Sequence, residues 1–259
     1  MNLKWYLTGM ILLQLRSVHG LRGTRFFSSV RKIRALRMEL DRSIESALIR
    51  DSGVEYVIGC DEAGRGPLAG PLVVAALTCK PDGGLLLPGV NDSKKLSELQ
   101  RERLYEQIIQ RPDAFAYNIA VIGPALIDEL NILRATMLGM QMVIDDLVAD
   151  LGGASSSFYA IVDGNKTPPK LSCSARPMVK ADSLCYSVAL ASIMAKVTRD
   201  RLMSGEYHEM WPMYNFARHK GYSTREHMLL INKHGPCPIH RLTYKPLKGR
   251  QVQQDPPSC

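Results

Sequence analysis

Several features that would point to particular classes of protein are missing from this 259-residue sequence. It has no internal repeat and no low-complexity run, which argues against solenoids and propellers. Its six cysteines include no CxxC pair and have no histidine at a zinc-binding spacing, so we expect free thiols in a reducing compartment. The apolar run from Trp5 to Leu15 is shorter than the ~20 residues that a membrane span needs, so we expect no membrane association.

Acidic residues are also missing from the first 37 positions, which hold eight lysines and arginines. Such a basic, serine-containing segment is typical of an organelle-targeting peptide. Lys4 before the apolar run also resembles a secretory signal, and a disordered basic arm is a third alternative. We expect residues 1–45 to be this leader and the protein to enter mitochondria or another organelle. An internal start at Met38 would skip the leader and leave the protein in the nucleus or cytosol.

The remainder of the chain carries no formal net charge. Eight of the 33 basic residues lie in the leader, so residues 38–259 hold 25 basic residues (33 less 8) against 25 acidic ones. The overall charge therefore gives no evidence of a nucleic-acid partner, and any such case must rest on local residues.

Strand-like and helix-like segments alternate along this remainder. Short β-branched runs or continuous apolar runs predict four strands: 54–60, 71–79, 114–121 and 158–162. Helical spacing predicts three helical regions: one after a capping box at Ser97–Gln100, one over 124–150 with a break near Asn131, and one over 183–203. This order predicts an α/β domain over 50–248 with a partly parallel sheet, a mostly irregular chain from Trp211, and a flexible tail over 249–259.

Four acidic residues stand at the ends of these apolar segments: Asp61, Glu62, Asp163 and Asp182. Asp182 could be only a helix N-cap, and Asp163 with Gly164 only a turn. The adjacent pair at 61 and 62 is harder to explain structurally, because two buried carboxylates repel each other unless cations neutralise them. Convergent carboxylates suit Mg²⁺ or Mn²⁺, and two such ions can promote phosphodiester hydrolysis. The pair can converge only if the strand ends or bulges there.

Residues suited to binding a nucleic acid lie near these carboxylates in the sequence. They fall into three groups: Gly64, Arg65 and Gly66; Ser93, Lys94 and Lys95; and Lys220 with Tyr222, followed by His240 and Arg241. Glycines allow a backbone to approach a ligand closely, hydroxyls and lysines before a helix can hold a phosphate, and a tyrosine can stack on a sugar or base. Each group alone is weak evidence, since most such residues are solvated or packed.

Six motifs in this order resemble those of type 2 ribonuclease H, the ribonuclease HII family. They are DEAGRGPLAGP (61–71), NDSKKLS (91–97), VDGN (162–165), ADSLCYSVALASIMAKVTRDR (181–201), HKGYST (219–224) and GPCPIHR (235–241). The resemblance implies a ribonuclease-H-like fold with a central mixed sheet flanked by helices and a helical C-terminal part. The compact body resembles the single-chain form of the family, here with an N-terminal extension.

The resemblance also implies an activity and roles for individual residues. The family hydrolyses the RNA strand of RNA–DNA hybrids and nicks duplex DNA 5′ of an embedded ribonucleotide, leaving a 3′-hydroxyl and a 5′-phosphate. Asp61, Glu62, Asp163 and Asp182 fall on its metal-binding set, residues 64–66 on its ribonucleotide-recognising loop, and Tyr222 on the tyrosine that senses the RNA–DNA junction. We expect Tyr222 to stack beneath the sugar of the next nucleotide. A role in ribonucleotide excision during DNA replication and repair is implied as well.

Some positions depart from the family pattern. Ala181 replaces a glycine before the fourth aspartate, and Cys185 and Tyr186 replace small residues, but every carboxylate is kept. The tail KGRQVQQDPPSC has no Gln followed by an aromatic pair, so no sliding-clamp motif is visible, and we expect a monomer. The alternatives are a hybrid-binding protein without catalysis, a four-carboxylate 3′–5′ exonuclease, and a glycosidase using the pair at 61 and 62. Adjacent residues do not easily reach the glycosidase separation of about 5–9.5 Å.

Overall fold

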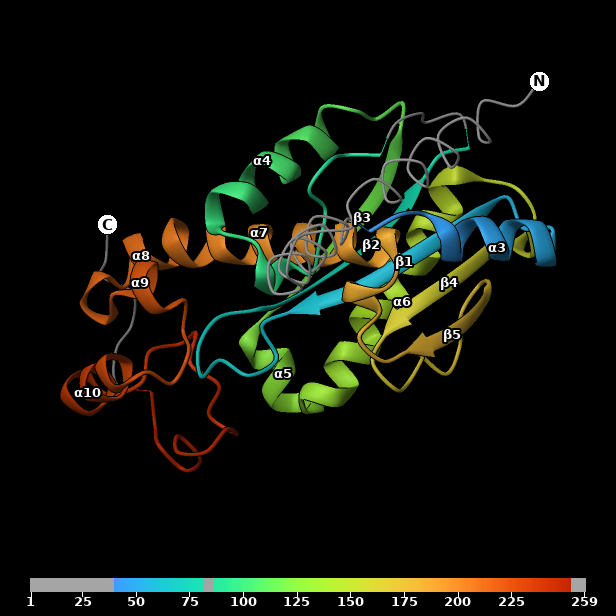
Figure 1. The fold of residues 1–259 in the computed structure, drawn as a ribbon. Helices are drawn as coiled ribbons and strands as arrows, with labels where there is room; N and C mark the ends of the chain where they lie inside the picture. The colour runs from blue at the N-terminus through green and yellow to red at the C-terminus, as the bar shows by residue number, and fades with distance from the viewer. Residues whose placement is uncertain (1–39, 82–85, 253–259) are drawn as a thin grey trace, which may run out of the picture. The chain divides into compact units, whose positions relative to one another are not determined.

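The computed structural model describes residues 40–81 and 86–252, and five strands at its centre form one mixed sheet (Figure 1). The strands are β1 (Tyr56–Ala63), β2 (Leu72–Cys79), β3 (Phe115–Ile122), β4 (Phe158–Asp163) and β5 (Ser174–Met178). They lie in the order β3-β2-β1-β4-β5, with β1, β2 and β3 antiparallel and β1, β4 and β5 parallel. The mixed α/β fold class is confirmed, and the first four strands fall where the apolar runs predict them.

Helices cover both faces of this sheet. They are α3 (Ser43–Ser52), α4 (Glu98–Ile109), α5 (Pro124–Leu130), α6 (Ile132–Leu151), α7 (Tyr186–Ser204), α8 (Glu206–Met210), α9 (Phe216–His219) and α10 (Arg225–His234). Every residue of β2 is buried, because its alternate side chains pack against α7 and α4 on one face and α6 on the other. Figure 1 shows α7 running along the sheet and α8, α9 and α10 gathered at one end.

Local signals fix the boundaries of several helices as predicted. Ser97 and Gln100 form the capping box of α4, with each side chain bonded to the backbone of the other. The break in 124–150 lies at Asn131, whose side chain accepts hydrogen bonds from the N–H groups of Leu133 and Arg134 and thereby starts α6. Both features are confirmed.

The close contact between β1 and α7 depends on one glycine. A Cβ atom on Gly59 would lie 2.2 Å from the backbone of Ser187 and Val188. Only glycine lets the first turn of α7 approach the middle of β1 so closely. This contact places α7, and with it Ser192, beside the end of β1.

Two expectations are changed by the structure. The strand β5 was not predicted. The chain after Trp211 is mostly irregular as expected, although it also contains α9 and α10, which lie around a buried cluster of aromatic and apolar side chains. The helix predicted from 183 begins at Tyr186, after a short 3₁₀ turn over Ala181–Ser183.

The boundary between leader and domain also differs from the expected positions 45 and 50. The helix α3 spans both positions, and Glu45 is fully buried, accepting hydrogen bonds from Ser187 N and the Cys185 thiol. This carboxylate satisfies a free N–H group at the start of α7, where Cys185 provides no side-chain cap. The packed fold therefore includes residues that the sequence assigned to the leader. Residues 1–39 and 253–259 lie outside the described residues.

Candidate active site

The first three predicted carboxylates are brought together by the parallel pairing of β1 and β4. The last pair in that ladder joins Cys60 to Val162, so the next residues along the two strands are Asp61 and Asp163. Their side chains lie at the same edge of the sheet because parallel strands run in the same direction. Two residues that are far apart in the sequence become neighbours in this way.

Asp61 and Glu62 lie within β1, which continues to Ala63 in regular register with β2. The prediction that the strand ends or bulges at this pair is therefore wrong. What ends there is the pairing with β4, so the two residues have β2 on one side only. Asp61 is almost fully buried and accepts hydrogen bonds from the Glu62 N–H group, at 2.7 Å, and the Ser192 hydroxyl.

The carboxylates of this cluster are poorly neutralised by the protein. Burial, and then the charges of Glu62 and Asp163, raise the pKa of Asp61 well above its usual value. Burial also raises the pKa of Glu62, although Arg65 donates to its Oε1 at 3.2 Å and opposes the shift. The pKa of Asp163 is raised by burial and by the charge of Asp182. The site therefore favours an added cation.

Asp182 completes the acidic cluster from the 3₁₀ turn before α7. Its Oδ2 accepts a hydrogen bond from Lys94 Nζ at 2.9 Å, so it is not the helix N-cap that the sequence offered as the alternative. The neighbouring Ala181 donates its N–H to Asp163 Oδ1 at 2.7 Å. The left-handed residue of this turn is Lys180, at φ 59°, so alanine in place of the family's glycine at 181 introduces no strain.

The donor set fits a hard divalent cation such as Mg²⁺ or Mn²⁺. All four groups are carboxylates, and Glu62 Oε2 is buried without any hydrogen-bond partner. Across residues 40–81 and 86–252, no three Asp, Glu, His or Cys side chains are arranged around one common point. The carboxylates instead interact as neighbours, Asp61 with Glu62 and Asp163, and Asp163 with Asp182, and Glu62 lines a small pocket.

That pocket has a volume of about 150 Å³ and brings together residues from four segments. Its lining residues are Glu62, Ala63, Gly64, Ser93, Lys94, Ser192, Lys196 and Tyr222. The loop at 93–95 is held in place because Ser93 Oγ lies 2.8 Å from Ser192 Oγ, and Arg101 donates to the carbonyl groups of Ser93 and Leu96. Lys95 lies beside this pocket, half exposed and 3.8 Å from Asp92.

The loop Gly64–Pro71 follows β1, and its carbonyl groups are occupied by the protein. The fully buried Arg241 donates to the carbonyls of Gly64 at 2.6 Å, Arg65 at 3.0 Å and Gly70 at 2.9 Å. The N–H groups of residues 64–66 form no hydrogen bond within the described part of the chain. A Cβ atom on Gly66 would meet nothing within 4 Å, so this stretch of backbone is open to a ligand.

Tyr222 lies on the other side of the pocket with 41% of its surface exposed. Its ring has two cations over it, Lys196 Nζ at 5.8 Å and the Arg199 guanidinium at 5.6 Å from the ring centroid. Lys220 does not line this pocket, because its Nζ donates to the carbonyl of Ala217 at 2.7 Å. His240 and Arg241 are buried beneath the loops and do not face the pocket.

Two buried histidines support the segment that carries Tyr222. The chain of hydrogen bonds runs from Cys237 N to His240 Nδ1, from His240 Nε2 to His227 Nε2, and from His227 Nδ1 to the carbonyl of Tyr222. Each ring donates from one nitrogen and accepts at the other, which requires neutral imidazoles. Burial lowers the pKa of His227 to about 4 and that of His240 to about 3, so both are neutral at physiological pH.

Sequence reasoning missed Ser192, Lys196 and Arg199. Ser192 and Lys196 are four residues apart on α7, so they share the helix face that lines the pocket. That spacing was visible in the sequence, although nothing in it said which face of α7 meets the carboxylates. The burial of Arg199 depends on contacts with distant segments and leaves no local signal.

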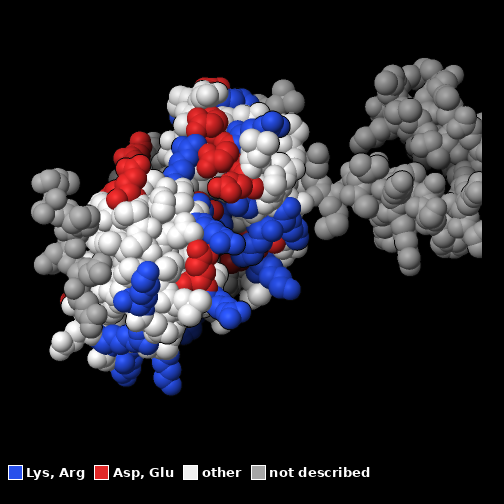
Figure 2. All heavy atoms as spheres, turned by 90° about the vertical axis from the view of Figure 1, so that its left-hand side faces the viewer, with Lys and Arg blue, Asp and Glu red and all other residues white. Residues whose placement is uncertain are grey.

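On the face of the molecule that lies to the left in Figure 1, positive charge is confined to small groups of side chains. Figure 2 shows Lys and Arg side chains gathered beside carboxylates near the middle of the face, next to broad uncharged areas. This agrees with the neutral balance of residues 38–259. A nucleic acid would therefore be held by specific contacts around the pocket rather than by a uniformly basic surface.

The family model for ribonuclease HII matches residues 58–247. The chain belongs to the ribonuclease HII family. Its curated relatives include the ribonuclease HII of Caldanaerobacter subterraneus, 44% identical over 201 residues that cover 77% of this chain and 78% of the relative. The ribonuclease HII of Xanthomonas campestris is 42% identical over 222 residues, covering 82% and 88% of the two chains.

Solved structures of ribonuclease HII enzymes show the same fold. The Archaeoglobus fulgidus ribonuclease HII, solved in complex with PCNA, matches with a TM-score of 0.58 and 26% identity over 77% of this chain and 97% of that one. The Pyrococcus horikoshii ribonuclease H2 matches with a TM-score of 0.55 and 25% identity, over 74% and 95%. The fold also matches a Bst-RNase HIII solved with Mn²⁺, at a TM-score of 0.52 and 19% identity. The predicted family and fold are confirmed.

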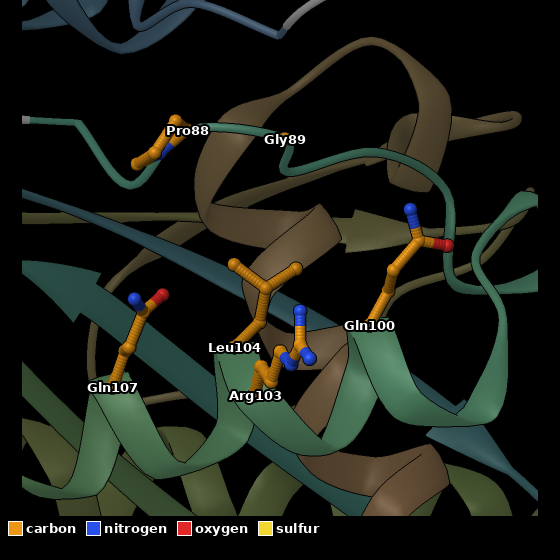
Figure 3. Close-up of a pocket in the computed structure, with 6 residues that line it drawn as sticks. All are labelled: Pro88, Gly89, Gln100, Arg103, Leu104 and Gln107. Carbon is orange, nitrogen blue, oxygen red and sulfur yellow. The ribbon is translucent and has the colours of Figure 1, made fainter.

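A second pocket of this ribonuclease HII fold lies on α4 (Figure 3). Side chains of α4, among them Gln100, Arg103 and Leu104, point toward the loop that carries Pro88 and Gly89. This second pocket shares no lining residue with the pocket beside Glu62, and no acidic residue lines it. No helix among the described residues has the length and apolar character to cross a membrane.

Proposed function

We propose that this chain is a metal-dependent endonuclease that hydrolyses the RNA strand of RNA–DNA hybrids and nicks duplex DNA 5′ of an embedded ribonucleotide. The products are a 3′-hydroxyl and a 5′-phosphate. The observation that carries the proposal is the arrangement around one pocket. Glu62 lines it, with Asp61 and Asp163 close to Glu62, and the pocket is also lined by Gly64 of the open backbone loop and by Tyr222. Family membership supports the same activity.

The acidic cluster would hold the divalent cations. Mg²⁺ and Mn²⁺ are the ions with which we would test this. When bound, two such ions supply an activated water and neutralise the charge that develops on the leaving oxygen. Asp61, Glu62, Asp163 and Asp182 are the residues available to hold them. The raised pKa values of Asp61, Glu62 and Asp163 make cation binding favourable, because burial and neighbouring carboxylates disfavour their charged forms.

The open loop provides a means of recognising a ribonucleotide. At a single position, only the 2′-hydroxyl distinguishes RNA from DNA. The N–H groups of Gly64, Arg65 and Gly66 are available to hydrogen-bond such a group, and Gly66 presents no side chain to block it. The carbonyl groups of this loop are held by Arg241, so the loop is already fixed before the substrate binds.

The remaining side chains position the nucleic acid on either side of the scissile bond. Lys94 reaches into the pocket and is suited to contact a phosphate, and Lys95 lies on the same short turn. The exposed ring of Tyr222 provides a stacking surface for the neighbouring sugar or base. We propose that this stacking selects a deoxyribonucleotide at that position.

The test uses an end-labelled DNA duplex with one internal ribonucleotide, incubated with Mg²⁺, Mn²⁺ or a chelator. Wild type should nick the strand 5′ of the ribonucleotide only with metal, and Asp163→Asn should lose this activity. Failure to cut this duplex while long hybrids are cut would contradict recognition by residues 64–66 and Tyr222. A covalently closed circular substrate separates an endonuclease, which cuts it, from an exonuclease, which does not.

We also propose a cellular role in ribonucleotide excision during DNA replication and repair, with the protein acting as a monomer. The basic residues 1–37 support import into mitochondria or another organelle. Fluorescent fusions of the full chain and of a version starting at Met38 test the localisation. A nuclear or cytosolic signal from the full chain would overturn it.

A further inference from the structure

Arg199 of α7 is fully buried although it carries a charge. Its guanidinium donates hydrogen bonds to three backbone carbonyls: Pro71 at 2.9 Å, Lys220 at 3.0 Å and Ala69 at 3.1 Å. The adjacent carboxylate, Asp200, is paired with Lys196 and Arg101 instead. Burial lowers the pKa of Arg199 to about 10, so the group remains charged at neutral pH. Burying a cation among carbonyls alone is energetically unfavourable, which calls for a reason beyond packing.

The three carbonyls belong to the two segments that face the substrate. Pro71 and Ala69 lie in the loop that begins at Gly64, and Lys220 lies two residues before Tyr222. The N–H groups of Leu68 and Ala69 also donate to the carbonyl of Gly221, so the segments are joined directly as well. Arg199 thus lies beneath the junction of the two segments.

Glycines mark the points at which the segments approach Arg199 and each other. A Cβ atom on Gly64 would lie 2.2 Å from Arg199 Nε, and one on Gly221 would lie 2.4 Å from the carbonyl oxygen of Ala69. Both glycines have positive φ, at 99° and 82°. The first glycine of the Gly-Arg-Gly motif is therefore required by Arg199 and the backbone, whereas only Gly66 opens toward a ligand.

A comparison with Arg241 shows what is particular to Arg199. Arg241 is equally buried and also donates to carbonyls, but all of these belong to the loop, at Gly64, Arg65 and Gly70. Of the two arginines, only Arg199 also bonds to the segment that carries Tyr222, at the carbonyl of Lys220. Its guanidinium lies 5.6 Å from the centroid of the Tyr222 ring. Its fork of N–H groups fixes the distance between the loop and this ring.

We propose that Arg199 is a positioning residue that couples the Gly64–Pro71 loop to Tyr222 and thereby determines which phosphodiester bond is cut. The inference rests on the proposed function, because the loop contacts the ribonucleotide and Tyr222 contacts its neighbour. The spacing between these two contacts selects the bond that lies over the carboxylates. Lysine at 199 keeps the charge but loses the fork, and so loses the spacing.

The test compares wild type, Arg199→Lys, Tyr222→Ala and the double variant on a single-ribonucleotide duplex and on a DNA duplex with four consecutive ribonucleotides. A misplacement of about 1 Å lowers rates by about 100-fold, so Arg199→Lys is expected to lower kcat/KM on the single ribonucleotide by about this factor. On four ribonucleotides it should spread cleavage over several bonds. In the Tyr222→Ala background, the same substitution should cost less than about threefold, because the coupled partner is already absent.

Two further variants separate a loss of positioning from a loss of folding. Arg201→Lys is the matched control on the same helix, since Arg201 is partly exposed and paired with Glu102 and Glu106, and it should leave rate and cleavage position unchanged. Gly221→Ala places a methyl group between the two segments with Arg199 intact, and should reproduce the spread of cleavage sites even where Arg199→Lys folds poorly. Circular dichroism melting of each variant establishes that it is folded at the assay temperature.

The proposed coupling would be overturned if substitutions at Arg199 and Tyr222 acted independently of each other. If the losses of Arg199→Lys and Tyr222→Ala multiply in the double variant, or if the folded Arg199→Lys and Gly221→Ala proteins cut at the wild-type bond, Arg199 has only a structural role. Wild type that cuts neither substrate with either metal overturns the proposed function itself, and the two failures are therefore distinguishable.

Discussion

Replacing Asp61 by asparagine is expected to stabilise the metal-free protein while abolishing its activity. Asp61 is buried beside Glu62 and Asp163, and its pKa is raised well above the usual value by burial and by these two charges. Ionising it in the folded protein at neutral pH therefore opposes folding. Asparagine has the same shape and keeps an oxygen that can accept the hydrogen bonds from Glu62 N and Ser192, but it has no charge.

The size of the effect follows from linkage. Each unit by which a native pKa exceeds its unfolded value opposes folding by ~1.4 kcal/mol once the pH is above both values. In a domain of this size, 1 kcal/mol shifts Tm by about 2–4 °C, so each unit corresponds to about 3–6 °C. The penalty is absent below the unfolded pKa, grows as the pH rises from the unfolded to the native pKa, and is complete above the native pKa. The gain in Tm of Asp61→Asn should therefore be larger at pH 8 than at pH 5.

Added metal should reverse the order of stability. An ion present at 100 times its Kd adds ~2.7 kcal/mol to the wild type, or about 5–11 °C, and should add much less to Asp61→Asn. Melting curves by circular dichroism with EDTA or with Mg²⁺ measure both effects, and Asp146→Asn on the exposed side of α6 is the control. If Asp61→Asn melts below wild type in EDTA at pH 8, or gains as much from Mg²⁺, the description of a charge-strained metal site is refuted.

Four other substitutions test the remaining contacts. Gly66→Ala should leave Tm unchanged but slow cleavage at a single ribonucleotide, whereas Gly64→Ala should lower Tm because its Cβ has no room; equal melting temperatures for the two variants would contradict this. Glu45→Ala leaves a buried N–H group of α7 unpaired and should cost about 1–3 kcal/mol in urea unfolding, so an unchanged midpoint would argue against docking of α3. For His227, whose pKa is lowered to about 4, protonation of the unfolded state should reduce stability as the pH falls from 6.5 toward 4. His227→Gln should remove about 1.4 kcal/mol per pH unit of that loss; an unchanged pH slope would show that this histidine does not remain neutral in the fold.

Much of the sheet and the acidic cluster could be predicted from the sequence because the signals are local. The buried strand β2 is a continuous apolar run, and the carboxylates stand at the ends of such runs. The break at Asn131 and the capping box at Ser97 depend on side chains that bond to their own backbone. These interactions are decided within a few residues, so distant parts of the chain do not change them.

The elements that were missed depend on distant contacts. The edge strand β5 contains Pro177 and polar residues, and it forms because β4 offers it a parallel ladder. The helix α10 follows a stretch without regular apolar spacing, yet Thr224 caps it, and His227 and Ile231 are buried on one of its faces. A threonine followed by apolar residues at helical spacing was the one signal available for α10.

The sequence predicted the types of residue in the site better than it predicted the contacts that hold them in place. The residue types at 61–66 and 222 indicated a carboxylate centre beside a recognition surface. The buried role of Arg199 could not be inferred, since an arginine in a helix is normally solvated. Lys220, expected to contact the substrate, instead has its ammonium group bonded to a nearby carbonyl.

The parallel pairing of β1 with β4 has a consequence for the timing of synthesis. About 100 residues separate Asp61 from Asp163, and at ribosomal rates of roughly 5–20 residues per second the second follows the first by about 5–20 s. During that interval β1 can pair only with β2, its antiparallel neighbour, and the edge where the carboxylates meet does not exist. A nuclease made in this order has no active site while the first half of its chain is still emerging from the ribosome.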